Sequence, residues 1–282
     1  MTAIIESDSL RVGIEDFGAE LAFITSATSG REFLWSGDPS IWSGRAPILF
    51  PIVGRLIDDR LRLPDGTYHL PKHGFAMNSL FSLAESGKSH AVFRLTDSDE
   101  TYQCYPFRFT LDAQFCVKGR TLAITYRVCN RGERPMPFSI GGHPAFRCEI
   151  GDKLVFSEKE TALAQKLNHN AYLETAEDVF HGSNELIITK SIFDNDALIF
   201  EGLRSGSVTL ESAVYRIKVD LGGCPYLGIW AKPGAPYVCV EPWFGIDDHV
   251  GDDTDFYHKK GIITLAPEDT FTDTYQIHIL ED

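Results

Sequence analysis

The stretch FRFTLDAQFCVKGRTLAITYRV, residues 107–128, decides the fold of this chain. Its apolar side chains fall on every second position in two segments, which the short turn KGR (residues 118–120) separates. Strict alternation of this kind is typical of strands with one buried face and one polar face. The stretch therefore predicts a long antiparallel hairpin, with strands over Phe107–Val117 and Leu122–Val128.

The same period of two continues along the chain. Further strands are predicted at Leu10–Ile14, Glu20–Ser26, Ala91–Leu95, Val208–Leu210, Tyr215–Leu221, Tyr226–Ala231, Tyr237–Val240 and Tyr275–Leu280. Helical periodicity is almost absent, and only residues 170–178 suggest a turn or two of helix. Because no linker or repeat marks a boundary, we expect one all-β domain over residues 1–282, with its antiparallel sheets packed as a sandwich.

The composition excludes several classes of partner. The chain has 26 Lys and Arg against 40 Asp and Glu, a formal net charge of -14, with only scattered basic pairs, which disfavours binding to nucleic acid. The first residues lack the pattern of a signal peptide, and no apolar run is long enough to span a bilayer. The six cysteines show no C-x-x-C spacing, so we expect reduced thiols packed as small apolar side chains. We therefore expect a soluble cytoplasmic protein, monomeric or homodimeric, without a membrane partner.

Two motifs place a proton-transferring side chain directly before a proline. They are GGHPAF (residues 141–146), with His143, and CVEPWFG (residues 239–245), with Glu241. A following proline favours an extended backbone, which gives an acid/base pair a stiff support. The alternatives are a histidine that caps a strand end, and a glutamate in a buried ion pair with an arginine.

A third motif, GRAPILFPIVGRL (residues 44–56), holds two arginines. Its two prolines make a continuous central strand unfavourable. Arg45 and Arg55 each carry a fork of donors that suits neighbouring hydroxyls or a carboxylate. The alternative is a buried loop whose arginines pair with Asp58 or Asp59.

A fourth motif, LPKHGFA (residues 70–76), combines a histidine with an aromatic residue. The glycine after His73 allows a ligand to approach the backbone, and Phe75 can offer an aromatic face to a sugar ring. A lone histidine is more often structural. A metal site is a further alternative, with the ligands His69, His73, His143 and Glu241.

Other polar and aromatic residues have ordinary interpretations when taken alone. Asp196 is typical of a turn aspartate. Trp230 and Trp243 are either core residues or a stacking platform. The acidic residues Asp247, Asp248, Asp252, Asp253 and Asp255 suggest a solvated loop, without the ligand pattern of an EF-hand.

Taken together, these four motifs resemble those of the aldose 1-epimerase (galactose mutarotase-like) superfamily, and most closely the LacX-type branch of aldose epimerase-related proteins. They fall in the family's order and span most of the chain. The resemblance implies a large twisted antiparallel β-sandwich with a sugar site in a cleft on one sheet. It also implies an isomerase that needs no metal or cofactor and acts on a small-molecule sugar.

The resemblance also implies roles for individual residues. His143 corresponds to the general acid and Glu241 to the general base, with His143 protonated and Glu241 ionised at working pH. We expect the nearby carboxylate to raise the pKa of the histidine. Substrate-binding roles are implied for Arg55 in preference to Arg45, for His73 and for Asp196. With these we group the aromatic candidates Phe75 and Trp243.

Three other functions remain open at this point. A non-catalytic carbohydrate-binding or sugar-sensing protein would keep the cleft but would need no matched acid and base. A hexose-6-phosphate-specific epimerase would use Lys72, Arg45 or Arg55 to hold the phosphate. A cupin-like metalloenzyme would need an H-x-H pair on a strand, which this chain lacks.

Overall fold

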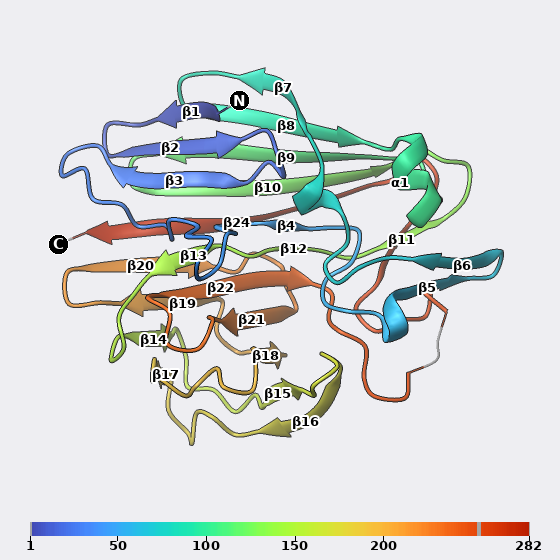
Figure 1. Cartoon of the computed structure of the whole chain (residues 1–282). Coiled ribbons are helices and arrows are strands. Elements are labelled where there is room, and N and C mark those ends of the chain that lie inside the picture. Colours follow the sequence, from blue (N-terminus) through green and yellow to red (C-terminus); the bar gives the residue numbers. More distant parts are fainter. Residues whose placement is uncertain (1, 253–254, 282) are drawn as a thin grey trace.

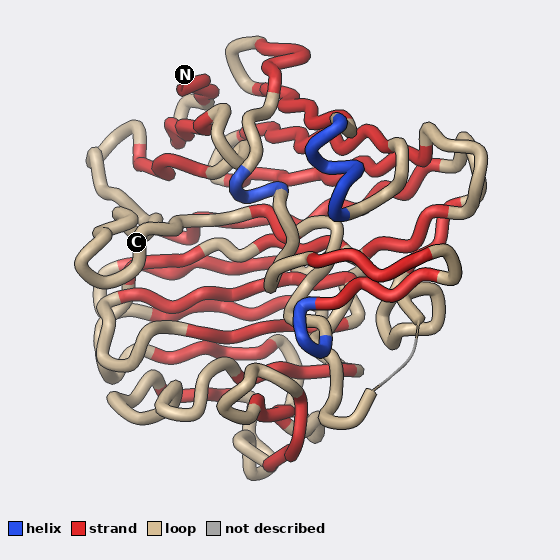
Figure 2. The backbone as a smooth tube through the Cα atoms, turned by 45° about the vertical axis from the view of Figure 1, so that its right-hand side comes forward, coloured by secondary structure: helices blue, strands red, loops and turns tan. Residues whose placement is uncertain are grey.

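The protein is a β-sandwich, as the alternation predicts (Figures 1 and 2). The computed structural model describes residues 2–252 and 255–281, and within them two large antiparallel sheets carry most of the chain. The nine-stranded sheet has the order β17 (Glu185–Ile187), β14 (Lys153–Phe156), β19 (Ser207–Glu211), β20 (Tyr215–Asp220), β24 (Thr270–Glu281), β10 (Thr121–Asn130), β9 (Phe109–Lys118), β8 (His90–Thr96) and β7 (Ser82–Ser86).

The second large sheet carries parts of three of the four motifs, and the fourth, residues 70–76, lies outside its strands. Its order is β16 (Leu173–Glu177), β15 (Ala164–Leu167), β18 (Leu198–Glu201), β21 (Tyr226–Trp230), β22 (Tyr237–Phe244), β12 (Ile140–Gly142) and β4 (Ile48–Leu49), with β13 (Ala145–Arg147) also paired to β22. The smaller sheets are β1 (Thr2–Glu6), β2 (Leu10–Glu15) and β3 (Leu21–Ser26), the hairpin of β5 (Arg60–Leu63) and β6 (Gly66–His69), and the pair β11 (Met136–Phe138) and β23 (Ile263–Leu265). Figure 1 shows β1–β3 and the second large sheet over one face of the nine-stranded sheet.

The predicted hairpin is confirmed as β9 and β10. Lys118 pairs with Thr121 at its end, and Gly119 adopts a φ of 54°, which a glycine accommodates without strain. The alternating residues of both strands are buried between the sheets, together with apolar residues of β12, β21 and β22. The two sheets approach closely at Gly142, where an added Cβ would lie 2.6 Å from the Tyr275 hydroxyl of β24.

Two local expectations differ from the structure. The segment at residues 170–178 forms no helix, because Leu173–Glu177 pairs with β15 as strand β16. The α-helix α1 (Asp99–Cys104) was not expected from periodicity; Ser98 and Thr101 cap its first turn reciprocally. The remaining helical turns are η1 (Ile57–Asp59) and η2 (Ala76–Asn78). No helix of the described residues is long and apolar enough to cross a membrane.

Candidate active site

The register of the second sheet brings His143 and Glu241 together. β22 pairs with β12 through Gly141↔Trp243 and with β13 through Ala145↔Cys239, in one continuous antiparallel register. Residues 143 and 241 are therefore opposite each other at the point between these two pairings. The backbone N–H of His143 donates away from β22, to the Pro47 carbonyl. The two residues thus form a non-hydrogen-bonded pair, the arrangement in which facing side chains come closest.

The two side chains are in contact and buried. His143 Nε2 lies 3.2 Å from Glu241 Oε2, with side-chain exposures of 11% and 1%. That contact lacks the geometry of a hydrogen bond, and the Trp243 indole lies near enough to Glu241 to lower its pKa. Among the described residues, the buried side-chain polar atoms without a well-formed hydrogen bond are His143 Nδ1, Glu241 Oε2 and Trp243 Nε1. Buried polar atoms are nearly always hydrogen-bonded, so three unsatisfied ones at one point indicate a place for a polar ligand.

Burial sets the protonation of the pair. It lowers the pKa of His143 from its ordinary value of 6.5 to about 3, and the charge of Lys72 lowers it further. Burial also raises the pKa of Glu241 well above its ordinary value, an effect that Lys72 opposes. The expectation that the carboxylate raises the histidine pKa is therefore wrong, because desolvation outweighs the attraction. Between the two pKa values the pair holds one proton, whichever side chain carries it.

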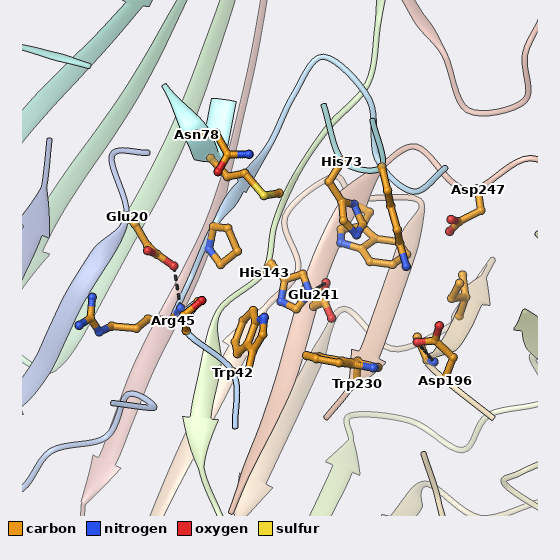
Figure 3. Close-up of a pocket in the computed structure, with 18 of the residues that line it drawn as sticks. Glu20, Trp42, Arg45, His73, Asn78, His143, Asp196, Trp230, Glu241 and Asp247 are labelled. Carbon is orange, nitrogen blue, oxygen red and sulfur yellow. Dashed lines mark hydrogen bonds and ion pairs between the residues drawn. The ribbon is translucent and has the colours of Figure 1, made fainter. Parts of the chain in front are cut away.

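A cavity of about 560 Å³ lies over this pair. Aromatic rings surround the imidazole of His143: the ring centroid of Trp42 lies at 5.1 Å, that of Trp230 at 5.7 Å and that of His73 at 6.0 Å (Figure 3). The cavity is lined by Glu15, Phe17, Glu20, Trp42, Ser43, Gly44, Arg45, Pro47, Lys72, His73, Met77, Asn78, His143, Leu167, Asp196, Ala197, Ile199, Trp230, Glu241, Trp243 and Asp247. About half of these residues are polar or charged, so the wall combines convergent polar groups with aromatic and apolar surface, as a site for a small polar molecule requires.

His73 is held in a strained backbone conformation with one ring nitrogen already engaged. Its φ is 66°, and its Nδ1 lies 3.1 Å from the backbone nitrogen of Gly54, whose N–H it accepts. Burial lowers the pKa of His73 well below its ordinary value, so the ring is neutral and its proton is on Nε2. His73 can therefore donate a hydrogen bond from Nε2 to an oxygen acceptor.

Two glycines fix the position of Trp243 beside the pair. A Cβ on Gly141 would lie 2.6 Å from Cδ1 of the indole, and one on Gly228, across from Glu241 on β21, would lie 2.6 Å from Cζ2. Any larger residue would therefore displace the ring. Gly141 of the GGHP motif and Gly228 thus make room for an aromatic wall of the cavity.

Several predicted site residues line the cavity and two do not. His73, Asp196 and Trp243 are among its lining residues, together with the pair itself. Arg55 is not: its Nε donates to Asp59, as in the alternative of a structural ion pair. Phe75 is not either.

The ring of Phe75 packs against the aromatic core instead. Its centroid lies about 6 Å from those of Phe50, Tyr105 and Phe109. The resemblance favoured Arg55 over Arg45 as a substrate-binding residue. The structure reverses this order, because Arg45 lines the cavity and Arg55 does not.

The acidic segment is not a simple solvated loop. Asp247 and Asp248 are 1% and 7% exposed. Asp247 accepts from the Arg55 backbone N–H at 2.7 Å, and Asp248 pairs with Lys259. These protein donors take the place of the water that would hydrate the two carboxylates in a solvated loop. Asp252 and Asp255 are partly exposed, whereas Asp253 lies outside the described residues.

The four-ligand metal set is not assembled. His69 is exposed on β6 and does not line the cavity. The ligand atoms of His143, Cys239 and Glu241 do lie within 4.8 Å of one another. Burial, however, raises the pKa of the Cys239 thiol well above its usual value, which opposes the thiolate that a metal would require.

Several lining residues gave no usable signal in the sequence. Glu20, Trp42 and Asn78 reach the cavity from loops and turns of the N-terminal third, far along the chain from the pair (Figure 3). Asp247 had a weak signal, because it comes shortly after the apolar strand β22, with only Gly245 and Ile246 between them.

Comparison with solved structures defines the class of fold as the galactose mutarotase-like sandwich. A galactose mutarotase related enzyme from Lactobacillus acidophilus superposes with a TM-score of 0.94 at 32% identity, over 99% of this chain and 97% of the other. A galactose mutarotase-like protein from Lactobacillus casei ATCC 334 gives a TM-score of 0.94 at 29% identity, over 99% and 100% of the two chains.

The chain belongs to the aldose 1-epimerase family, whose model matches residues 2–278. It is 30% identical to the plasmid-encoded protein LacX of Lactococcus lactis subsp. lactis, over 99% of this chain and 100% of that protein. Membership of this family supports an isomerase-type enzyme that acts on a sugar.

Proposed function

We propose that this protein is an aldose 1-epimerase that interconverts the α and β anomers of an aldose by acid/base catalysis at His143 and Glu241. The observation that carries the proposal is the buried pair with its unsatisfied polar atoms, open to a cavity lined by tryptophans. A sugar that binds there supplies the missing hydrogen-bond partners. His73 and Asp196 are proposed to bind its hydroxyls, and Trp243 to contact its ring.

The proton held by the pair is the one that the reaction uses. The neutral arrangement and the His143 cation with the Glu241 anion differ only by transfer of that proton within the pair. Lys72 lines the same cavity, and its positive charge lowers the pKa of both side chains. It therefore favours the ionised glutamate as a base and makes the protonated histidine a stronger acid.

The reaction then needs two proton transfers in each direction. Glu241 takes the proton of the hydroxyl on C1 while His143 donates its proton to the ring oxygen, and the C1–O5 bond breaks. The resulting aldehyde rotates about C1–C2. On closure Glu241 returns its proton to the carbonyl oxygen, His143 recovers a proton from the O5 hydroxyl, and the other anomer is formed. A positioned proton transfer is worth about 10²–10⁴-fold in rate.

The test is two-dimensional exchange NMR of anomer interconversion on a panel of free and 6-phosphorylated aldoses, with wild type beside Glu241→Gln. Acceleration that the variant loses supports the proposal and identifies the sugar class. If only 6-phosphorylated sugars respond, the enzyme is a hexose-6-phosphate epimerase. Binding without acceleration supports a non-catalytic sugar-binding protein instead.

A further inference from the structure

The cavity extends from the catalytic pair in two directions (Figure 3). On one side are Asp196, Asp247 and Trp230, and on the other are Glu20, Arg45 and Asn78. The first side is the inner arm, where Asp247 is 1% exposed. The second is the outer arm. Glu15 belongs to it through its ion pair with Arg45, and Phe17 lies beside Asn78, because Phe17 forms a β-bridge with Leu80 and the Gly18 N–H donates to the Ser79 carbonyl.

A single sugar ring fills only one of these arms. When C1 and O5 contact the pair, the rest of the ring points away from it in one direction. The inner arm suits that ring, because its residues are buried or partly buried and combine carboxylates with indole rings, and exclusion of water strengthens proton-transfer chemistry. The outer arm is then left beside the ring, and the total of about 560 Å³ lies in the range of sites that enclose larger ligands, about 300–1,000 Å³.

The outer arm has the chemistry of a second sugar site. Phe17 stands at its rim with 52% of its surface exposed, an aromatic face available to the apolar side of a sugar. The exposed Asn78 amide points toward the cavity and has no side-chain hydrogen bond within the described residues, so it can both donate to and accept from hydroxyls. Glu20 reaches the same arm from the turn before β3.

The charges of the outer arm select against an anion. The Arg45 guanidinium is engaged by Glu15 at 3.4 Å and by the Ser36 carbonyl at 3.0 Å. Glu20 is a further carboxylate, and it accepts the backbone N–H groups of Arg45 and Ala46. A phosphate or carboxylate placed here would meet two carboxylates and one cation that is already paired.

We propose that the outer arm is a subsite for a second, uncharged sugar unit, so that the preferred substrate is a reducing disaccharide. Its reducing-end unit occupies the inner arm and reacts at the pair. The second unit is joined through an atom other than C1, since the C1 hydroxyl must be free, and it stacks on Phe17 and bonds to Asn78. The placement of the reacting unit rests on the proposed function.

The test compares glucose with disaccharides that carry glucose at the reducing end through 1→4 and 1→6 linkages. Exchange NMR gives kcat/KM for each sugar with wild type, Phe17→Ala and Asn78→Ala. The matched control is Leu80→Ala, because Leu80 is also exposed, lies beside Phe17 in a β-bridge and does not line the cavity. Calorimetry on the same proteins gives the dissociation constants.

We expect wild type to favour one of the disaccharides over glucose. Phe17→Ala should lower the disaccharide-to-glucose ratio of kcat/KM by roughly 2- to 10-fold, the effect of one aromatic contact, and Leu80→Ala should leave the ratio as it is. Equal ratios for wild type and both cavity variants would overturn the subsite. If no sugar is accelerated, the proposed function fails, and calorimetry decides the subsite: tighter disaccharide binding that Phe17→Ala weakens supports it, and equal or absent binding overturns it.

Discussion

Two buried pairs in this protein each join a basic side chain to a carboxylate, and they differ in how their polar atoms are satisfied. Lys259 Nζ donates to Asp248 Oδ1 and to the Ile246 carbonyl, each at 2.7 Å, and Asp248 Oδ2 accepts the Ile57 backbone N–H at 2.8 Å. The His143–Glu241 pair leaves Nδ1 and Oε2 without partners. The first pair joins loop segments, and the second faces a cavity.

The difference teaches how a structural pair can be told from a candidate catalytic one. Burying a charge costs free energy unless hydrogen bonds replace the lost water. The lysine pair has those hydrogen bonds, so its role is complete without a ligand. The histidine pair lacks them, which costs stability in the free protein and leaves groups for a substrate to satisfy. Substitutions in the two pairs should therefore have opposite consequences.

The largest effect is expected for Glu241→Gln. Loss of the base should lower kcat by about 10²–10⁴-fold, while the unfolding temperature is kept or raised because the amide carries no charge to desolvate. Exchange NMR and thermal unfolding measure the two quantities. A fully active variant would show that the pair is structural, like that of Lys259.

Lys259→Met should have the reverse effect, a loss of stability rather than a loss of kcat. It leaves the Asp248 carboxylate buried without its cation, and we expect a loss of about 3–5 kcal/mol in the free energy of unfolding, measured in urea. The matched control is Lys260→Met. That neighbour pairs with Glu201 at the surface, where both side chains are at least 40% exposed, so the expected loss is about 0–1 kcal/mol. Equal losses for the two variants would contradict the structural role of the buried pair.

Asp196→Asn tests a carboxylate of the cavity that forms no ion pair within the described residues. A hydrogen bond to a charged group contributes about 1.5–3 kcal/mol, so kcat/KM should fall by roughly 10- to 100-fold with little change in stability. Steady-state kinetics and urea unfolding provide the measurements. A loss of stability without a change in kcat/KM would place Asp196 with the structural carboxylates.

The smallest effect concerns pH and stability. The folded pair keeps one proton from about pH 3 up to the raised pKa of Glu241, whereas the unfolded chain holds two below about pH 4.5, one up to about 6.5 and none above. Because the pKa of Glu241 is higher in the folded protein than in the unfolded chain, the stability that its proton contributes is lost as pH rises. Stability from the pair is therefore level between about pH 4.5 and 6.5, and above 6.5 it falls by at most about 1.4 kcal/mol per pH unit until the pH passes the folded pKa of Glu241. Urea unfolding at pH 6.5–8.5 should show this fall for wild type and not for Glu241→Gln. If the free energy of unfolding changes with pH in parallel for the two proteins, the folded pair does not retain a proton.

The sequence predicted the longer strands well because strand alternation is a local property. The hairpin at residues 107–128 and the strand at Tyr237–Val240 were both found, the latter continuing to Phe244 as β22. The strands that it missed in the described residues each have two to five residues, among them β14, β15 and β18, and the short helix α1 was missed as well. Elements of this length are too short for periodicity to distinguish.

The sequence also pointed to His143 and Glu241, because proline and glycine neighbours are unusual supports for ionisable residues in strands. It did not indicate which arginine lines the cavity, that Phe75 packs in the core, or that Asp247 is buried. Positions along one loop look alike in sequence. Only the packing of other segments decides which of them face a cavity.

By itself the sequence determined an all-β sandwich, an acidic chain and two candidate proton-transferring residues. Tertiary structure alone decided that these residues face each other, since their contact depends on the register of β22 with β12 and β13. It also decided their protonation, because desolvation inside the sandwich outweighs the attraction between them. Alternation and proline effects act between neighbours in the chain, whereas register, burial and cavity shape come from residues about a hundred positions apart.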